Sequence, residues 1–287
     1  MHRWRRQKVR AHAYDLDWKM LAEANRRLNM IKPTCAGKEW VVRNFFPLAP
    51  RELNVYTRVV AISSDTNGSL AGLEDELNQA KDQLNAFPDG FMRKLDLYQP
   101  LRPIVKKTFK LRAGTNATLK IYEILRKIDL PRDQPLRVFC NAELPGAFLD
   151  VIMHYFKHAD WVASSFYPKA AKANKTILSD TYKLYAKNKE RWLMGPDLSG
   201  DLTDAAVVVA LNKRVHEVFS EGVDLYTSDA GIDVSGDPNK QEIDTLWLNH
   251  GQVLSGLLSL RKGGTMVTKQ YTVFHEHNRS LVAKLVP

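Results

Sequence analysis

From residue 136 onward, short apolar runs alternate with longer stretches in which apolar residues recur at helical spacing. The runs predict strands, and the stretches between them predict helices. This alternation is typical of β-α-β units, so we expect an α/β domain built around a parallel sheet. The expected strands are 136–141, 161–164, 223–227 and 265–268, and the expected helices are 148–156, 205–219 and 240–260.

Two signals indicate where these helices begin and end. Thr203 or Asp204 is a suitable N-cap for the helix 205–219, because a short polar side chain can accept a hydrogen bond from a free amide of the first turn. Gly263 and Gly264 predict the end of the helix 240–260. The pattern between residues 170 and 200 predicts no definite element.

The first hundred residues show weaker patterns. Residues 15–28 have apolar side chains at helical spacing, and residues 73–84 predict a polar helix. The first fourteen residues form a basic run without any acidic side chain. Such a run favours a solvated tail, with a nucleic-acid-binding arm or a transit peptide as alternatives. Its basic residues are Arg3, Arg5, Arg6, Lys8 and Arg10. We therefore expect a mostly helical N-terminal extension over 1–100, a candidate for RNA or partner binding, and the main domain over 101–287.

The charge of the chain points to a polyanionic partner. Lys and Arg number 42 against 32 Asp and Glu, which gives a formal net charge of +10. Residues 101–132 carry nine basic side chains and two acidic ones, whereas residues 201–250 are rich in acids. An extended anion would therefore meet a polarised surface if these segments lie apart.

Composition also excludes several classes of protein. No apolar run approaches the roughly 20 residues of a membrane span, so we expect no membrane association. The sequence has only two cysteines, which excludes a disulfide framework and favours a reducing compartment. Zinc fingers and iron–sulfur clusters are excluded on the same ground.

The carboxyl ends of the expected strands are where an open parallel sheet binds its ligand. The first strand continues into the turn 143–148, where Gly146 would let backbone amides approach a nucleotide or nucleoside-like cofactor. Taken alone, this segment is equally compatible with a plain β-α turn that binds no cofactor. It lacks the G-x-G-x-x-G pattern of dinucleotide sites, which argues against a nucleotide-dependent oxidoreductase.

Three polar residues stand out near these strand ends. Asp229 and Lys269 follow neighbouring strands, so a carboxylate and an ammonium can meet over one substrate. A strand-end Asp is a structural cap about as often as a catalyst. Lys120 lies just ahead of the sheet, and its simplest interpretation is a solvated helix lysine in a basic segment.

The histidines and tryptophans give no further site. We expect His250 to be a hydrogen-bonded core histidine, because its helix neighbours at helical spacing are apolar. His275 and His277 are two residues apart, which does not place two imidazoles on one helical face, so we expect no metal site. Trp161 and Trp192 are expected to be packing residues.

Taken together, five ordered segments resemble the FtsJ-like ribose 2′-O-methyltransferases, in particular the mRNA cap methyltransferases of eukaryotes and large DNA viruses. The resemblance covers about residues 100–287, and any one segment alone would be a weak signal. The segments are 140–148 (CNAELPGAF), 161–168 (WVASSFYP), 200–203 (GDLT), 226–231 (YTSDAG) and 263–269 (GGTMVTK).

The resemblance implies a Rossmann-like, S-adenosylmethionine-dependent methyltransferase fold over 101–287 that acts on RNA, with the 5′ cap region of mRNA as the expected substrate. It places Lys120, Asp229 and Lys269 at the first three positions of the family's Lys-Asp-Lys-Glu tetrad. It also implies that S-adenosylmethionine binds along one cleft without a metal, and the residues so implied are Glu143, Leu144, Pro145, Gly146, Ala147, Phe148, Ser164, Ser165 and Asp201.

The tetrad residue types suit the chemistry that the resemblance implies. A ribose hydroxyl attacks a sulfonium methyl in line, so the enzyme must align two reactants and accept one proton. Lys269 would be the base, since desolvation and the like charge of Lys120 favour its neutral amine. Asp229 would hold Lys269 in position. The methylated guanine of a cap would bind in an aromatic slot, and the sequence does not distinguish among the candidates for it, which are Trp4, Trp40, Tyr98 and Tyr167.

This chain departs from the family pattern near its C-terminus. The fourth tetrad residue and the last strands of the family sheet are not found before Pro287, and Glu276 is too close to Lys269 to serve. The exposed sheet edge would need a cover, for which a protein partner is a candidate. Three explanations stay open: a fragment, a glutamate from elsewhere, or a catalytically impaired RNA-binding or scaffold subunit. The expected location is the cytoplasm or nucleus, or, for a viral protein, the host cytoplasm, virus factory or virion.

Overall fold

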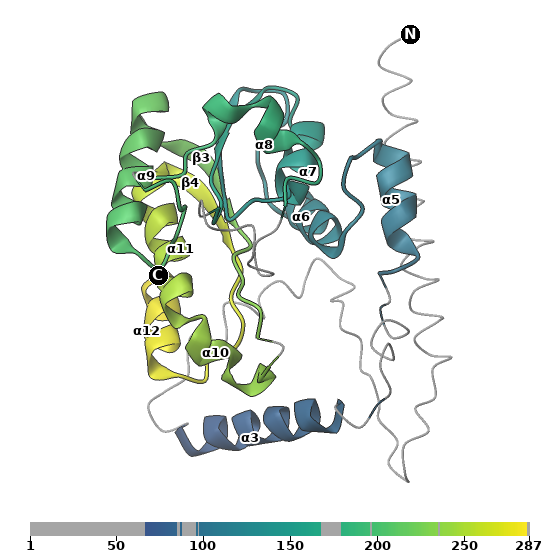
Figure 1. Ribbon diagram of the computed structural model, residues 1–287, viewed down its shortest axis with the longest axis vertical. Coiled ribbons are helices and arrows are strands. Elements are labelled where there is room, and N and C mark those ends of the chain that lie inside the picture. Colours follow the sequence, from purple (N-terminus) through teal and green to yellow (C-terminus); the bar gives the residue numbers. More distant parts are fainter. Residues whose placement is uncertain are drawn as a thin grey trace.

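Four parallel strands form the centre of the protein in a computed structural model (Figure 1). The structure describes residues 67–84, 87, 96, 98–167, 179–195, 197–234 and 236–285. The strand order is β2-β1-β3-β4, so the chain starts in the middle of the sheet and builds outward to both sides. The strands are β1 (Leu136–Asn141), β2 (Ala159–Ala163), β3 (Val223–Ser228) and β4 (Leu260–Thr268).

Helices connect the parallel strands and cover both faces of the sheet, which confirms the expected Rossmann-like α/β fold. Helix α3 lies apart from the sheet, at the bottom of Figure 1, where Lys81 Nζ donates to the Pro238 carbonyl (3.1 Å). The helices are α3 (Asn67–Leu84), α5 (Leu101–Phe109), α6 (Asn116–Lys127), α7 (Ala147–Tyr155), α8 (Leu184–Lys187), η4 (Lys189–Arg191), α9 (Ala205–Val218), η5 (Pro238–Lys240), α10 (Gln241–Asp244), α11 (Leu246–Ser259) and α12 (Glu276–Leu285).

The side chains of β1 alternate between two hydrophobic cores, as the pleat of a strand requires. Leu136, Val138 and Cys140 belong to the core that includes residues of α6 and α7. Phe139 belongs to the core on the other face, which includes residues of α9. Both faces of β1 are therefore buried, and the strand is a rigid base for the turn that follows it.

The glycines of the last strand are a correction to the sequence analysis. Gly263 and Gly264 do not end a helix, because they lie inside β4, which begins at Leu260. Gly263 has a φ of 77°, and the pairing with β3 shifts register between Val223 and Leu225. A positive φ inside a strand favours glycine, so Gly263 accommodates the irregularity in β4.

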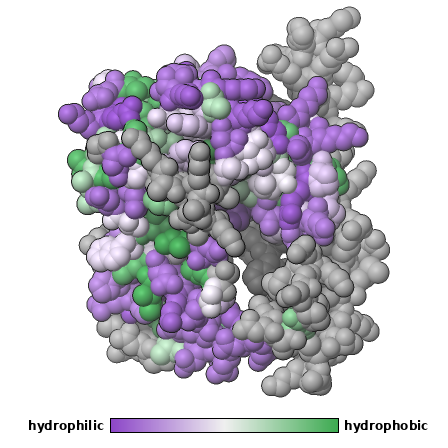
Figure 2. Space-filling model, viewed as in Figure 1, coloured by the Kyte–Doolittle hydropathy of each residue, from purple (hydrophilic) through white to green (hydrophobic). Residues whose placement is uncertain are grey.

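The expected helix 240–260 is interrupted. It consists of η5, α10 and α11, with a break at Thr245. The expectation that His250 sits in the core is wrong, because the neighbours on its face are exposed, Trp247 at 69% and Leu257 at 55%. His250 Nδ1 is 2.9 Å from the Leu246 carbonyl oxygen, so its hydrogen bond is local to the helix. Figure 2 shows apolar atoms among polar ones on the part of the surface where α9 to α12 lie.

Other expectations lie close to the observed elements. The polar helix 73–84 begins earlier, at Asn67, and Asp204 is the N-cap of α9. Trp161 and Trp192 are buried, which confirms their packing role. The expected helix 15–28 and the basic segment 1–14 lie outside the described residues. No described helix has both the length and the apolar character needed to cross a bilayer.

Candidate active site

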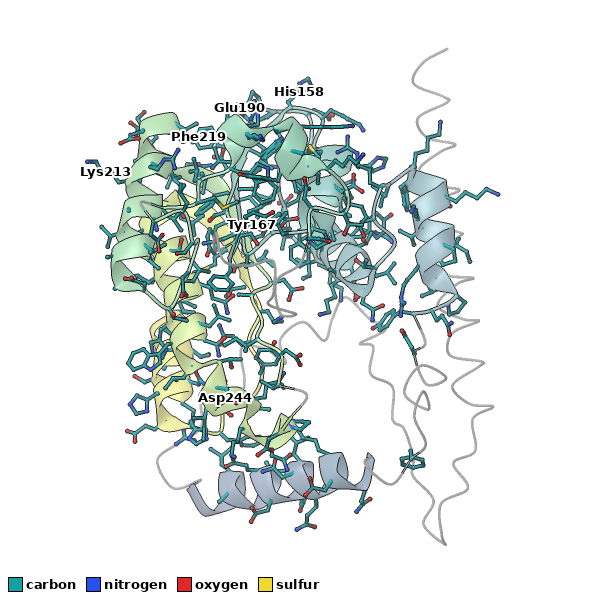
Figure 3. All side chains as sticks on the ribbon, viewed as in Figure 1. His158, Tyr167, Glu190, Lys213, Phe219 and Asp244 are labelled. Carbon is teal, nitrogen blue, oxygen red and sulfur yellow. The ribbon has the colours of Figure 1, made fainter. Side chains whose placement is uncertain are left out.

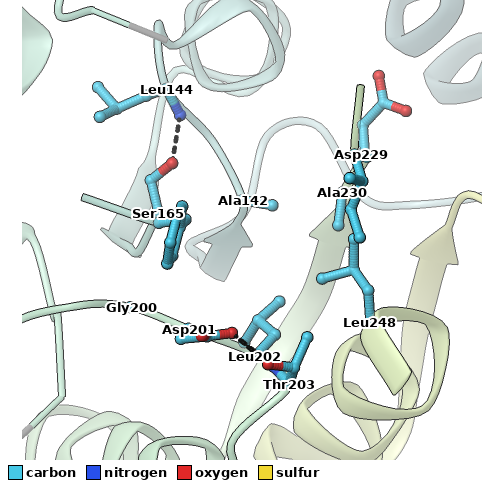
Figure 4. A pocket seen from close by; sticks show the side chains of 13 residues that line it. Ala142, Leu144, Ser165, Gly200, Asp201, Leu202, Thr203, Asp229, Ala230 and Leu248 are labelled. Carbon is cyan, nitrogen blue, oxygen red and sulfur yellow. Dashed lines mark hydrogen bonds between the residues drawn. The ribbon is translucent and has the colours of Figure 1, made fainter. Parts of the chain in front are cut away.

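A cavity of about 320 Å³ opens at the carboxyl ends of the strands (Figure 4). Its walls come from the ends of β1, β2 and β3, from the loop before α9, and from one residue of α11. A pocket of this volume suits a small molecule or cofactor. The lining residues are Ala142, Leu144, Ser165, Phe166, Gly200, Asp201, Leu202, Thr203, Asp229, Ala230, Gly231, Ile232 and Leu248.

The turn between β1 and α7 forms one wall and is held by backbone hydrogen bonds. The Glu143 amide donates to the Ser164 carbonyl (3.0 Å), and the Leu144 amide donates to Ser165 Oγ (3.2 Å). Gly146 has a φ of 108°, and a Cβ there would lie 2.2 Å from Leu184 Cδ1. Only glycine therefore allows this turn and its packing against α8.

Glu143 supports the turn from inside the protein. Its side chain is buried, and Oε1 accepts a hydrogen bond from the Leu149 amide (2.8 Å) in the first turn of α7. Burial raises the pKa of Glu143 to about 8 despite hydrogen bonds that act in the opposite direction. The carboxyl group therefore caps α7, keeps its proton to a higher pH than an ordinary glutamate and does not line the cavity.

The loop before α9 forms the opposite wall. Gly200 has a φ of 63°, and a Cβ there would lie 1.9 Å from the Ser165 carbonyl oxygen, so the loop passes directly against the end of β2. Asp201 Oδ1 accepts hydrogen bonds from the Thr203 amide (2.9 Å) and hydroxyl (2.7 Å) (Figure 4). Asp201 is thus fixed at the cavity edge by its own loop.

Asp229 and Lys269 meet at the ends of β3 and β4, as their positions in the sequence suggested. Lys269 Nζ donates to Asp229 Oδ1 (3.0 Å) and to the Asp229 carbonyl (3.2 Å). The backbone of Lys269 is held on both sides, because its amide donates to the Ser228 carbonyl (3.0 Å) and its carbonyl accepts from Gln252 Nε2 (2.6 Å). The pair is therefore preorganised beside the cavity that Asp229 lines.

Glu242 anchors the segment that follows Lys269. Its buried carboxylate accepts four hydrogen bonds, from Thr272 Oγ1 (2.6 Å), the Phe274 amide (3.0 Å), the His275 amide (2.8 Å) and Asn278 Nδ2 (2.9 Å). Burial by itself raises the pKa of Glu242, but these hydrogen bonds outweigh it and hold the pKa below its ordinary value. Glu242 is therefore an ionised anchor for residues 272–278.

Lys120 is an exposed residue of α6, and no contact among the described residues joins it to Asp229 or Lys269. The loop before its helix is tied to the site indirectly. Asp150, in the first turn of α7, accepts hydrogen bonds from the amides of Arg112 (2.6 Å) and Ala113 (3.0 Å). The role that the resemblance implies for Lys120 stays a prediction.

The predicted cofactor residues divide into two groups. Leu144, Ser165 and Asp201 line the cavity. Glu143, Pro145, Gly146, Ala147, Phe148 and Ser164 do not line it and shape the turn or the strand end behind it. Tyr167, a candidate for a base-binding slot, is 37% exposed, lies near the middle of Figure 3, and has its ring centroid 5.6 Å from that of Tyr185.

Sequence reasoning missed the contribution of α11 to the cavity. Leu248 was one of many apolar positions in an expected helix, and nothing in the pattern distinguished it from core residues. Gln252 and Glu242 were also missed, because their partners are backbone or side-chain groups 17 to 36 residues away. Within the described part of the chain, no cluster of His, Cys, Asp and Glu could hold a metal ion.

Comparisons with known proteins agree with this geometry. The sequence profile described as "FtsJ-like methyltransferase" matches residues 114–286. The "Probable methyltransferase EP424R" of African swine fever virus is 38% identical over 205 residues, which cover 67% of this chain and 47% of that protein. The "Cap-specific mRNA (nucleoside-2'-O-)-methyltransferase 2" of Danio rerio is 32% identical over 230 residues, 73% of this chain and 30% of that protein. The chain thus spans less than half the length of these two relatives.

Proposed function

Because this chain belongs to the FtsJ-like methyltransferase family, we propose that it transfers a methyl group from S-adenosylmethionine to a ribose 2′-hydroxyl of RNA, at or near the 5′ cap of mRNA. The observation that carries this proposal is the Lys269–Asp229 pair, with Nζ 3.0 Å from Oδ1, at the edge of a strand-end cavity of about 320 Å³. The name of the Danio rerio relative supports the cap region of mRNA as the substrate.

The cavity fits a nucleoside-like cofactor. Two of its walls carry glycines whose side-chain space is already filled, Gly200 by backbone of Ser165 and Gly231 by the tips of Lys269 and Tyr271. Leu144, Phe166, Leu202 and Ile232 supply apolar surface, and Asp201 supplies a carboxylate for polar groups of a ribose. When bound, S-adenosylmethionine supplies a methyl group on positively charged sulfur, which is a strong electrophile.

The protein's own groups perform the proton chemistry. Lys269 Nζ is the group positioned to accept the proton of the attacking ribose hydroxyl. Asp229 Oδ1 lies 3.0 Å from Nζ, orients it and stabilises the ammonium that forms when the proton arrives. The two backbone hydrogen bonds of Lys269 keep the base in place, so that little reorganisation is needed at the moment of transfer.

Exposed cations on α5 and on the loop before α6 support RNA as the substrate. No ion pair with another described residue neutralises them, and the loop is bound to the first turn of α7, next to the β1–α7 turn of the cavity. Such a surface can bind the phosphates of a single strand while the cavity region holds one ribose. The cations are Lys106, Lys107, Lys110 and Arg112.

The direct test is methyl transfer from labelled S-adenosylmethionine to capped and uncapped RNA of the same sequence. Wild type should label the 2′-oxygen of capped RNA, as read by nuclease digestion and mass spectrometry. Lys269→Ala and Asp229→Ala should lose activity by about 10²- to 10⁴-fold. Lys262→Ala, an exposed lysine in the amino-terminal half of β4, is the matched control.

Equal labelling by wild type and both variants, or methyl groups found on bases, would refute the proposal. RNA binding without any transfer would favour the alternative of a catalytically impaired RNA-binding subunit. Preference for uncapped RNA would exclude the cap as the substrate and leave ribose methylation in place.

A further inference from the structure

Tyr271 lies beside the candidate base. In an extended segment, residues two apart point to the same side, and Tyr271 follows Lys269 at that spacing. Lys269 Nζ is 5.0 Å from the centroid of the Tyr271 ring, within the range of a cation–π interaction. The ammonium therefore lies between a carboxylate, Asp229, and an aromatic face.

Gly231 shows where the Tyr271 hydroxyl points. A Cβ on Gly231 would be 2.9 Å from Lys269 Nζ and 2.9 Å from Tyr271 Oη, so both polar atoms lie over the same backbone position. Gly231 also lines the cavity. The phenol and the ammonium thus converge at the cavity edge, in the space that a side chain at residue 231 would otherwise occupy.

The Tyr271 hydroxyl is available to form a hydrogen bond with a ligand. Among the described residues, no hydrogen bond involves Oη, although the residue is partly buried and its neighbours Lys269 and Asp229 are paired with each other. A partly buried hydroxyl next to a fixed ammonium is suited to a polar atom of a ligand. Substrate RNA has such atoms in its ribose and phosphate groups.

We propose that Tyr271 positions the base and contacts the substrate: its ring holds the Lys269 ammonium beside Asp229, and its hydroxyl donates a hydrogen bond to the RNA backbone at the nucleotide being methylated. This inference rests on the proposed function. The ring lies against Nζ and limits the directions that Nζ can take beside Asp229. The hydroxyl adds affinity for RNA and has no part in proton transfer.

Two variants separate these roles. Tyr271→Phe keeps the ring and removes the hydroxyl, so the Kd for RNA, measured with S-adenosylhomocysteine present and without turnover, should rise about 3- to 10-fold. Tyr271→Leu also removes the ring, so the upfield ring-current shift of the Lys269 ε-methylene NMR signals should be kept in Tyr271→Phe and lost in Tyr271→Leu, since Nζ lies 5.0 Å from the ring centroid. The signals are assigned with Lys269→Met.

The kcat at saturating RNA gives the same ring test in catalysis. It should fall about 3- to 10-fold in Tyr271→Leu, where Nζ is held less well, and match wild type in Tyr271→Phe. Tyr182→Phe, which removes a hydroxyl from a tyrosine packed against the core, should change neither RNA affinity nor the Lys269 ring-current shift.

Each part of the proposal can fail separately. Unchanged RNA affinity in Tyr271→Phe would overturn the hydroxyl contact, and an unchanged Lys269 ring-current shift in Tyr271→Leu would overturn the role of the ring. Neither of these two measurements needs turnover. A wild-type protein without methyl transfer would therefore refute the proposed function while the binding and NMR results still decide the role of Tyr271.

Discussion

The two ends of the sheet use the same chemistry for different purposes. At the amino end, Asp224 of β3 bonds Arg137 of β1, with Oδ2 3.1 Å from Nε, and also pairs with Arg261 of β4. At the carboxyl end, Asp229 pairs with Lys269 and with no other residue that the structure describes. Asp224 has two cationic partners that saturate it, whereas Asp229 has one partner and faces a cavity.

This difference separates stability from reactivity. Burial raises the pKa of Asp224, but hydrogen bonds from Arg137 and Arg261 outweigh it and lower the pKa to about 2. A saturated carboxylate of this kind connects three strands and has no capacity for a ligand. The carboxyl end has an ion pair, a tyrosine hydroxyl that no other described residue bonds, and glycine-lined space, which are the properties of a site that binds and reacts.

The largest expected effect comes from neutralising each aspartate in turn. Asp229→Asn should lower methyl transfer about 10²- to 10⁴-fold, because Lys269 loses the charge that orients it, with little change in stability. Asp224→Asn should lower the free energy of unfolding by about 2 kcal/mol, since two arginines lose their shared anion, with the kcat of the folded protein unchanged. Urea denaturation and single-substrate kinetics on both variants measure this, and a swap of the two outcomes would contradict the comparison.

Two glycines that flank β3 sharpen the same contrast. Gly231→Ala would push the flexible tips of Lys269 and Tyr271, so activity should fall about 10- to 100-fold while stability changes by less than about 1 kcal/mol. Gly222→Ala, at a φ of 80° and with a Cβ 2.7 Å from the Ser259 carbonyl, should cost about 2 kcal/mol of stability and leave kcat unchanged. A stable, fully active Gly231→Ala protein would refute the placement of the site.

Glu143 gives the carboxyl end a dependence of stability on pH. Its pKa is about 8 in the folded protein against an ordinary 4.5, so the folded state binds more protons between these values and stability falls as pH rises. The loss should approach about 1.4 kcal/mol per pH unit in this window. In Glu143→Gln the slope should flatten, as measured by thermal or urea unfolding from pH 4 to pH 9, and an unchanged slope would assign it to other groups.

The smallest expected effect tests which end of the sheet faces RNA. The double variant Lys110→Gln, Arg112→Gln should reduce the slope of log Kd against log salt by about 0.7 for each phosphate that the protein no longer binds. Lys262→Gln at the amino end should leave the slope unchanged. Equal changes in both proteins would mean that RNA binding is spread over the surface and is not directed to the carboxyl end.

The sequence predicted those parts of the fold that depend on local pattern. The expected strand 136–141 coincides with β1, because both of its faces are buried and its apolar run is continuous. Asp204 was a candidate N-cap because its function depends on its own neighbours. The meeting of Asp229 and Lys269 followed from topology, since parallel neighbouring strands bring their carboxyl ends to one edge.

The errors arose where tertiary contacts outweigh local pattern. Gly263 and Gly264 are ordinary helix-ending residues, and only pairing with β3 places them in a strand. The apolar face around His250 was assigned to the core because of its helical spacing, yet its neighbours are exposed. Periodicity shows which side of a helix is apolar but does not show whether another element packs against that side. The anchors Glu242 and Asp150 bind backbone amides, which leave no trace in the sequence.

The anchor at Glu242 also determines how the protein responds to acid. The pKa of Glu242 is lower in the folded protein than in the unfolded chain. Its hydrogen bonds with Thr272 and Asn278 therefore contribute their full stability above the unfolded pKa. This stability is lost only as pH falls through the pKa of the folded protein. The loop after Lys269 should therefore stay docked as pH falls through the ordinary range of a glutamate and undock only below it. The architecture next to the candidate base is thus built to tolerate mild acid.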